Sequence, residues 1–433
     1  MRIKKIVKKV VVFLGVCVPA VIVGQDVSQD IQVKAVHNAK VRLAVCVASD
    51  AQQELKEVAH IIKNDCMFSG QFEVSTVAVP AINDVNEERM LSVLCERGYI
   101  LALYLVYKSD LEIEWRLYDT ASKTMIEKRV YSKRGASRRW WGHHLADLIW
   151  PVLTGQDGFF SSRIAYCKEV KLPGKKKVQH ICVADYDGAN EQTIVDTPTV
   201  NLAPRFNRDP HNQLLFYSES TNRNIRLMHI DMKSRKRGVA SNFDGVNMLP
   251  SFCADGTKVA YCASKGAGNC DIYYYQKGSV KQLTHDGSNN ISPVFNDDGT
   301  QIFYCSDRNG GVPQLYCYTL SSGSSVALTK GPGAAYCPAY CAKRRQLAYC
   351  KKAKKIMQIF VYDETLKTHT QLTFNAGDKD ECAWSPCGNY LLYGTERQDQ
   401  SRIACFNLLT RQERFITPPG VQCSYPTYSF LVD

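Results

Sequence analysis

Residue types that catalyse reactions or bind cofactors occur in this 433-residue sequence without the spacing that such chemistry needs. It contains no GxSxG, HExxH or P-loop lysine motif, so neither a nucleophile elbow nor a zinc-protease helix nor a phosphate-binding loop is indicated. The carboxylates are scattered, and none forms an identifiable acid–base pair. The sequence therefore predicts no catalytic residue, no cofactor and no metal site.

One short run does gather reactive side chains: Arg138-Arg139, Trp140-Trp141, His143 and His144. Adjacent histidines on a helix point about 100° apart, so His143 and His144 cannot hold one ion together. We expect one histidine to be a hydrogen-bonded core or capping residue. The tryptophans should pack in the core or at a domain interface, with a ligand platform as the alternative. For the arginines we expect solvated positions at a helix start, with an anion site as the alternative.

Lysines gather in two short segments, which we expect to be the tips of β-hairpins: Lys175, Lys176 and Lys177 in the first, and Lys351, Lys352, Lys354 and Lys355 in the second. The formal net charge is +12, and five basic residues lie among the first nine residues. The remaining surplus favours an acidic or anionic neighbour over nucleic acid. These hairpins could steer an acidic partner, or they could be charge for solubility.

The elements that would position these side chains are indicated by a repeated phrase, Pro-x-aromatic followed by a turn and a strand ending in Tyr. Its six copies begin at Pro204, Pro250, Pro293, Pro338, Cys382 and Pro426, at spacings of 46, 43, 45, 44 and 44 residues. This period is typical of a propeller blade of four short strands. Turns such as Asp255-Gly256 and Asp298-Gly299 favour tight hairpins.

Counting the strands predicts how the ring closes. Six second strands end in tyrosine, at Tyr166, Tyr217, Tyr261, Tyr304, Tyr349 and Tyr393. The first of them lacks a preceding phrase, and the last phrase, at Pro426, lacks a following strand. We therefore predict that residues 156–433 form an all-β six-bladed propeller closed by the C-terminal strand. Deleting Ser424–Asp433 should destabilise the whole propeller.

Strand direction then predicts a channel mouth. The loops that enter each blade share one face with the hairpins between second and third strands, so the lysine-rich hairpins should lie beside the mouth. Four of the 18 cysteines directly follow the second-strand tyrosines: Cys167, Cys262, Cys305 and Cys350. Blades hold these positions apart, so we expect small buried hydrophobic residues and not a metal cluster.

The N-terminal part predicts export and a second domain. Residues 1–24 combine a basic start with a short apolar run, as a secretory signal peptide does. No other apolar run is long enough to anchor the chain, so we expect no stable membrane insertion. Residues 25–155 predict an α+β domain, a small mixed sheet with its helices largely on one side.

Several of these segments resemble the TolB family of the Tol-Pal system. Ala383-Trp384-Ser385-Pro386 is similar to the family's blade phrase, and residues 289–293 are similar to one of its channel-mouth loops. Outside the propeller, Asp65 with Ser69-Gly70 and the Arg116–Asp119 strand fit the family's first domain. Asp147, followed by Gly158-x-Phe160, fits its passage into the first blade.

The resemblance implies a periplasmic, non-enzymatic adaptor. Its expected partner is the peptidoglycan-associated outer-membrane lipoprotein, and inner-membrane Tol proteins are expected to bind through the mature N-terminus. By position, the lipoprotein site would include Asn247, Leu249, Asn289, Asn290, Ser292 and Tyr336. The sequence departs from the family phrase at Cys382, which replaces the blade proline, and at Lys343-Arg344-Arg345, which replaces an Asp-Gly type of turn.

Two other classes of protein remain open from the residues alone. One is an exported propeller peptidase or lyase with its site in the channel. The other is a propeller that binds cell-wall glycans. The absence of a nucleophile motif argues against the first, and a search for hydrolase activity beside a pull-down from an envelope extract would separate the three.

Overall fold

The computed structural model describes residues 40–81, 86–109, 112–132, 137–175, 177–209, 213–265 and 268–430. The predicted signal peptide, residues 1–24, lies outside these ranges, as do residues 25–39. None of the described helices has the length and apolar character needed to cross a membrane.

The first domain is a five-stranded mixed sheet with three helices, in the strand order β2-β1-β3-β4-β5. The parallel strands β1, β2 and β3 are followed by an antiparallel meander through β4 and β5. The bounds are β1 Val41–Ala48, α1 Gln53–Phe68, β2 Phe72–Val79, α2 Glu87–Glu96, β3 Leu101–Ser109, β4 Glu112–Asp119, β5 Thr124–Ser132 and α3 Arg138–Thr154.

The helices cover both faces of this sheet. Alternating side chains of β1 and β3 point to opposite faces, as strand geometry requires. Leu43 and Val45 lie in one core with α1 and α3, whereas Ala44 and Cys46 lie in another with Met90 of α2. The prediction of helices largely on one side is correct for α1 and α3 and wrong for α2, whose buried stripe packs against the second face.

The propeller begins with an eight-stranded sheet that combines two four-stranded meanders. The first meander is formed by β29 (Cys423–Tyr428), β6 (Arg163–Lys171), β7 (Lys177–Asp185) and β8 (Gln192–Val195). The second is formed by β9 (Val200–Phe206), β10 (Leu214–Ser220), β11 (Ile225–Asp231) and β12 (Arg237–Ser241). One residue pair, Gln179 with Val200, joins the two meanders.

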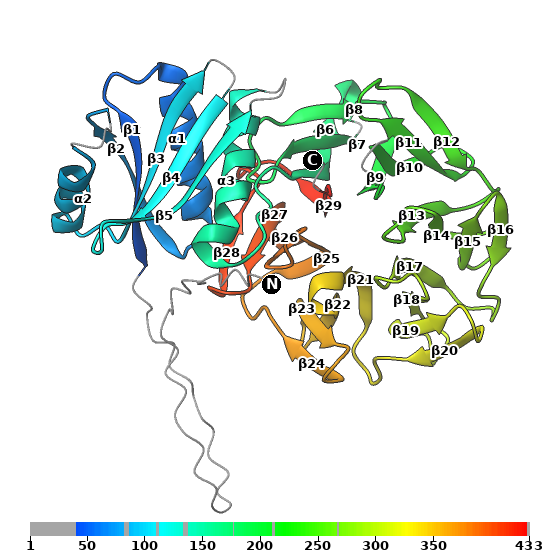
Figure 1. The fold of residues 1–433 in the computed structure, drawn as a ribbon. Helices are drawn as coiled ribbons and strands as arrows, with labels where there is room; N and C mark the ends of the chain where they lie inside the picture. The colour runs from blue at the N-terminus through cyan, green and yellow to red at the C-terminus, as the bar shows by residue number, and fades with distance from the viewer. Residues whose placement is uncertain are drawn as a thin grey trace, which may run out of the picture. The chain divides into compact units, whose positions relative to one another are not determined.

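Four further four-stranded sheets follow along the chain, and Figure 1 shows the sheets placed around a central opening. Two of them comprise β13 Asn247–Phe252, β14 Lys258–Ala263, β15 Asp271–Gln276, β16 Ser279–Gln282, β17 Asn290–Phe295, β18 Gln301–Ser306, β19 Gln314–Thr319 and β20 Ser324–Ala327. The other two comprise β21 Ala335–Cys341, β22 Gln346–Ala353, β23 Ile356–Asp363, β24 Thr368–Gln371, β25 Asp378–Trp384, β26 Tyr390–Arg397, β27 Gln400–Asn407 and β28 Gln412–Phe415.

The last strand of the chain lies beside the first strand of the propeller. β29 is antiparallel to β6, with Cys423 opposite Lys168 and Tyr428 opposite Ile164. Backbone bonds extend the pairing, because Ser429 N donates to the carbonyl of Arg163 over 2.7 Å. β29 therefore occupies the innermost place of a meander whose other strands come from the start of the propeller.

The core of the propeller is packed between neighbouring sheets. The second-strand tyrosines are all buried, at Tyr166, Tyr217, Tyr261, Tyr304, Tyr349 and Tyr393. The cysteines that follow four of them, Cys167, Cys262, Cys305 and Cys350, are also buried. These tyrosines and cysteines occupy equivalent positions in the second strand of successive meanders. One sequence phrase therefore recurs at a period of 43 to 46 residues.

The connection into the propeller is fixed by Asp147 of α3. Its carboxylate accepts hydrogen bonds from the backbone N–H of Phe160 (2.7 Å) and of Ser161 (2.8 Å). Burial raises the pKa of Asp147 to about 6, and these hydrogen bonds partly oppose the increase. A side chain at Gly158 would collide with Asp147, so glycine is required there.

The first domain is joined to the propeller by buried polar contacts. Arg139 donates to Asp185, the last residue of β7, and to Asp187 just beyond it, each over 2.6 Å, so the expected solvated position is wrong for this arginine. His143 and Tyr186 both bond the buried carboxylate of Asp65, at 2.8 and 2.7 Å. Burial would lower the pKa of His143, but its hydrogen bond and attraction to Asp65 raise it.

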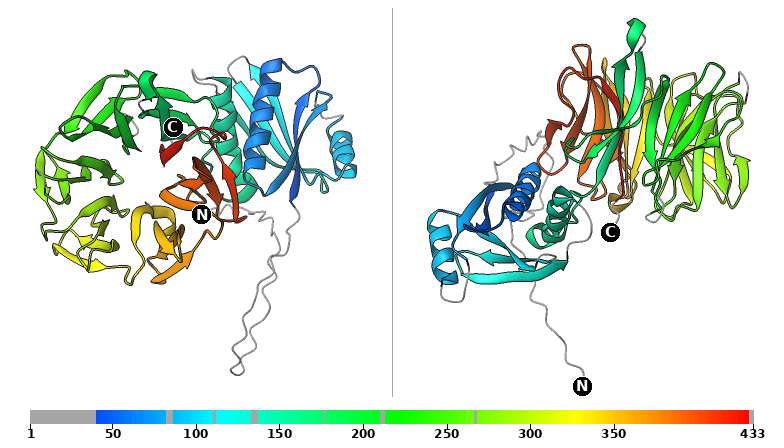
Figure 2. Two further views of the ribbon diagram at one scale, coloured as in Figure 1. Left: turned by 180° about the vertical axis from the view of Figure 1, so that it is seen from behind. Right: turned by 90° about the horizontal axis from the view of Figure 1, so that it is seen from above.

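α1 and α3 lie on the face of the small sheet that meets the propeller (Figure 2), within one hydrophobic core that includes residues of β6, β26 and β27.

Candidate functional site: the propeller channel

The innermost strand of each meander has the same irregularity halfway along the channel. A β-bulge interrupts the pairing with the second strand, and a residue with φ near +50° occupies it. The six residues, which we call the bulge ring, are Ala203, Leu249, Ser292, Cys337, Glu381 and Tyr425. Left-handed backbone is costly for residues other than glycine, and such strain is concentrated at functional sites.

The loops that precede these strands form the channel mouth, and buried side chains hold three of them. Asn201, Asn247 and Asn290 are fully buried. Each amide donates to the beginning of the third strand in the preceding meander. The acceptors are the carbonyls of Gln179 and Ile225, at 2.9 Å each, and the carboxylate of Asp271, at 3.1 Å.

In β25, the position equivalent to these buried asparagines is a lysine. Lys379 is fully buried, and its Nζ donates to the carbonyls of Asn375 (3.3 Å), Ala376 (2.9 Å) and Gly377 (2.5 Å). Burial lowers the pKa of Lys379 to about 8, and the nearby Arg397 adds to the decrease. The ammonium group thus fixes one mouth loop through three backbone oxygens.

The six predicted partner-binding residues all lie at or beside this mouth, but in different roles. Asn247 and Asn290 use their amides within the protein, so they shape the loops. Leu249 and Ser292 belong to the bulge ring and line the channel cavity. Asn289 is exposed and donates from its amide to Asp307 (2.9 Å), and Tyr336 is half-buried next to the ring.

The second lysine-rich hairpin lies at the same end of its sheet as the mouth. Lys352 N donates to the carbonyl of Ala334 in the preceding loop (3.0 Å), and Lys354 and Lys355 form the exposed turn between β22 and β23. In the first hairpin, Lys177 pairs with Glu169 at 2.8 Å, so its charge is partly neutralised.

The side chains of Lys175 and Lys176 lie outside the described part of the structure.

Two acidic residues of β25 lie at the bulge ring: Glu381 belongs to it, and Asp380 precedes it on the mouth side. Ligand atoms of Cys337, Asp380 and Glu381 lie within 4.8 Å of one another, a spacing at which a cation or a shared proton could bridge the carboxylates. Burial raises the pKa of Glu381 well above its ordinary value, repulsion from Asp380 adds to the increase, and Arg205 opposes it. Burial also raises the pKa of Asp380, although water reaches this side chain in the channel.

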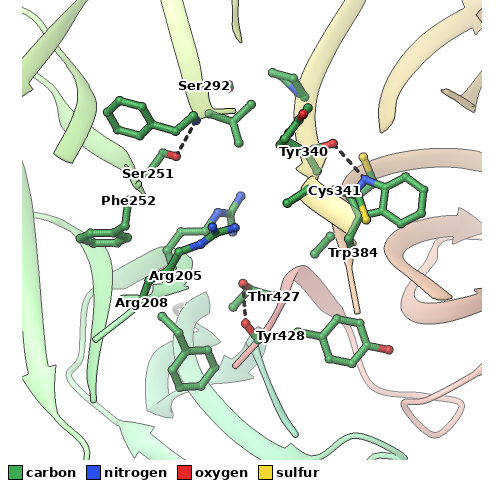
Figure 3. Close-up of a pocket in the computed structure, with 18 of the residues that line it drawn as sticks. Arg205, Arg208, Ser251, Phe252, Ser292, Tyr340, Cys341, Trp384, Thr427 and Tyr428 are labelled. Carbon is green, nitrogen blue, oxygen red and sulfur yellow. Dashed lines mark hydrogen bonds between the residues drawn. The ribbon is translucent and has the colours of Figure 1, made fainter. Parts of the chain in front are cut away.

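The opposite end, which we call the far end, is formed by the turns between first and second strands. A cavity of about 330 Å³ extends from the bulge ring to these turns. Arg205 and Arg208 both project into it (Figure 3). Neither arginine was among the residues expected from the sequence. Aligning the six copies of Pro-x-aromatic would have found Arg205, since it is the charged residue among six at position x.

Antiparallel four-stranded sheets around a lined axial cavity, preceded by a small α+β domain, define a two-domain β-propeller protein. Residues 150–432 match the TolB beta propeller domain family, and the chain belongs to this family.

Individual proteins are also similar to this chain in sequence. The chain is 31% identical over 244 residues to the Tol-Pal system protein TolB of Ruthia magnifica, which covers 55% of this chain and 56% of that protein. It is 29% identical over 234 residues to the protein of the same name from Gluconobacter oxydans, over 53% of this chain and 50% of that protein. The chain thus spans about half the length of the curated relatives it matches.

The fold is shared over both domains with a solved structure. The crystal structure of TolB from Acinetobacter baumannii superposes with a TM-score of 0.78, covering 91% of this chain and 97% of that one. The two sequences are 23% identical, so this match concerns the fold.

Proposed function

We propose that this protein is the periplasmic, non-enzymatic adaptor of a Tol-Pal system, exported by a signal peptide at residues 1–24. It binds the peptidoglycan-associated outer-membrane lipoprotein at the channel mouth and supports outer-membrane integrity and cell division. Family membership over residues 150–432 is the observation that carries the proposal. Its propeller acts as a closed ring of six blades, and the pairing of β29 with β6 supports this arrangement.

The mouth has the properties that a protein-binding surface needs. Its loops are held by buried hydrogen bonds before a partner arrives, which reduces the entropy lost on association. Leu249 and Tyr336 offer half-buried apolar and aromatic groups, and Ser292 and Asn289 offer polar ones. Lys352, Lys354 and Lys355 would attract an acidic partner toward the same face. Inner-membrane Tol proteins would bind separately, through the mature N-terminal segment.

The direct test is a titration of the purified mature protein with the soluble domain of the lipoprotein from the same organism. We expect saturable one-to-one binding that weakens when Leu249 or Tyr336 is replaced by Asp or Ala, respectively. Interface anchors of this kind cost about 1–3 kcal/mol when removed. Absence of binding at high micromolar concentration, together with hydrolase activity or binding to peptidoglycan fragments, would favour the peptidase, lyase or glycan-binding alternatives.

Electrostatic steering has a matched control in the chain. The double change Lys354→Glu and Lys355→Glu should slow association about tenfold at low salt and remove most of its salt dependence. Lys277→Glu and Lys281→Glu make the same change of charge at exposed positions, and Lys277, like Lys354, has a positive φ. The control lies at the β15–β16 hairpin and should associate at the original rate. Equal effects of both pairs would contradict steering by the β22–β23 hairpin.

A further inference from the structure

We propose that the far end of the channel is a second binding site, in which Arg205 and Arg208 receive the carboxylate of an acidic side chain from an entering protein segment. This site lies on the other side of the bulge ring from the mouth loops. It therefore does not depend on which partner binds the mouth.

The repeat itself sets Arg205 apart. At position x of the six Pro-x-aromatic copies, the other residues are small or medium in size: Ser251, Val294, Ala339, Ala383 and Thr427. All six line the cavity, so five strands leave space at this level and the sixth places a guanidinium in it. Figure 3 shows Arg205 directed into this space, between Ser251 and Thr427.

Arg208 adds a second guanidinium from the turn after β9. Its charged group lies over the ring of Phe430, 4.6 Å from the centroid, in the turn region that follows β29. Burial lowers the pKa of Arg208, and the more distant Asp297 only partly offsets this cost. Stacking on an aromatic ring holds the guanidinium in place without using its hydrogen-bond donors.

Neither arginine has a carboxylate partner within ion-pair distance among the described residues. Two other half-buried arginines of the propeller do have one, Arg226 with Glu219 and Arg397 with Glu413, and Arg402 instead donates to the carbonyl of Thr417. The third cation lining the cavity, Lys343, pairs with Asp157 at 2.6 Å. Enclosed charges are normally paired because desolvation is costly, so two unpaired guanidinium groups in one cavity indicate a missing anion.

The geometry and the lining favour a carboxylate on a carbon stem. Arg205 donates one N–H to the carbonyl of Pro204 (2.8 Å). Since a guanidinium has five donors, others can bind a ligand. Planar guanidinium groups match the two oxygens of a carboxylate. Phe252, Trp384 and Tyr428 provide apolar contacts along the same cavity, which suits the methylene groups of a glutamate. Because Arg208 lies in the turn after β9, at the far end, we expect the acidic segment to enter the cavity from that end.

The probe is an acetylated and amidated peptide, Gly-Ala-Glu-Ala-Gly, compared with its Gln counterpart by ligand-observed NMR titration against the mature protein. We expect the Glu peptide to bind at least about tenfold more tightly than the Gln peptide, as charged hydrogen bonds imply. Arg205→Gln and Arg208→Gln should each remove this preference. Arg89→Gln, an exposed change on α2, should leave it unchanged.

Three results would overturn the proposal. One is equal binding of the two peptides, and another is retention of the preference in both arginine variants. The third is competition by inorganic phosphate at lower concentration than by the Glu peptide, which would assign the site to phosphate.

A chain ending at Phe430 separates the two sources of a carboxylate. Binding of the Glu peptide to this shortened chain alone would mean that the protein's own C-terminal carboxylates fill the site, contrary to an external partner. Thermal melting of Arg208→Gln keeps the test valid, because a folded variant with an unchanged or higher Tm is expected when an unpaired cation is removed.

Discussion

The two ends of the propeller channel are formed by the same innermost strands, yet they differ in backbone and in charge. At the mouth, the loops are fixed by fully buried residues such as Asn247, Asn290 and Lys379, and the acidic pair Asp380 and Glu381 lies just inside. At the far end, short turns surround a cavity into which two arginines project. A repeated fold can therefore present carboxyl groups near one end of an axis and guanidinium groups near the other by varying a few positions per repeat.

The largest loss of stability is expected from deleting the strand β29, which contributes to both ends of the channel. Deleting Ser424–Asp433 takes away Tyr425 of the bulge ring, the buried Tyr428 and every residue pair between β29 and β6 except Cys423 with Lys168. Because β6 would then expose an unpaired edge and an open core, the loss should exceed the whole stability of a typical domain, about 5–15 kcal/mol. Circular dichroism melting should show no cooperative native transition.

The control for this deletion removes only residues 431–433 and leaves β29 in place, so it should melt close to the full-length chain. An unchanged cooperative melt of the longer deletion would show that β29 is not needed to complete the ring.

A smaller effect, confined to the mouth, is expected from Lys379→Met. Three loop carbonyls would lose their donor, at a cost of about 1–3 kcal/mol, and amide exchange at residues 374–378 should accelerate. Lys281→Met, at an exposed position, is the control and should leave both measurements unchanged.

The same lysine predicts a pH dependence. Its pKa is about 8 in the folded protein and higher in the unfolded chain, so the unfolded state binds more protons between pH 8 and about 10.4. The stability contributed by this site should therefore rise across that window in the original protein and stay flat in Lys379→Met. Parallel pH profiles of the two proteins would contradict a buried, charge-destabilised lysine.

The smallest effect is expected at the far end. Arg208→Gln removes an enclosed cation without a carboxylate partner, so Tm should stay the same or rise by about 1–2 °C. A marked fall in Tm would show that this arginine stabilises the turn after β9, which would argue against an unpaired cation that awaits an anion at the far end.

The repeat phrase predicted more of this fold than of its binding groups. Tyrosines at fixed places and Asp-Gly turns report the strand order directly, because each blade solves the same packing problem. The side of the sheet covered by α2 could not be predicted, since an amphipathic helix fits either face of a mixed sheet. The ion pairs of Arg139 with Asp185 and Asp187 were also not predicted, because residues that pair between two domains have no characteristic spacing in the sequence.

For the expected site residues, the position along the repeat predicted where each residue lies but not what its side chain contacts. Asn247 and Asn290 do lie at the mouth, but burial commits their amides to the loops. Leu249 and Ser292 face the cavity because a bulge turns the strand at that point. Bulges are set by backbone geometry and are not visible in residue types alone.

Lipoprotein binding at the mouth can be measured by hydrogen–deuterium exchange of the mature protein with and without the soluble lipoprotein domain. We predict slower exchange in residues 244–249, 286–292, 331–336 and 375–380, with no change in the turns between first and second strands. Protection confined to those turns, or no protection in the propeller at saturating lipoprotein, would contradict lipoprotein binding at the mouth.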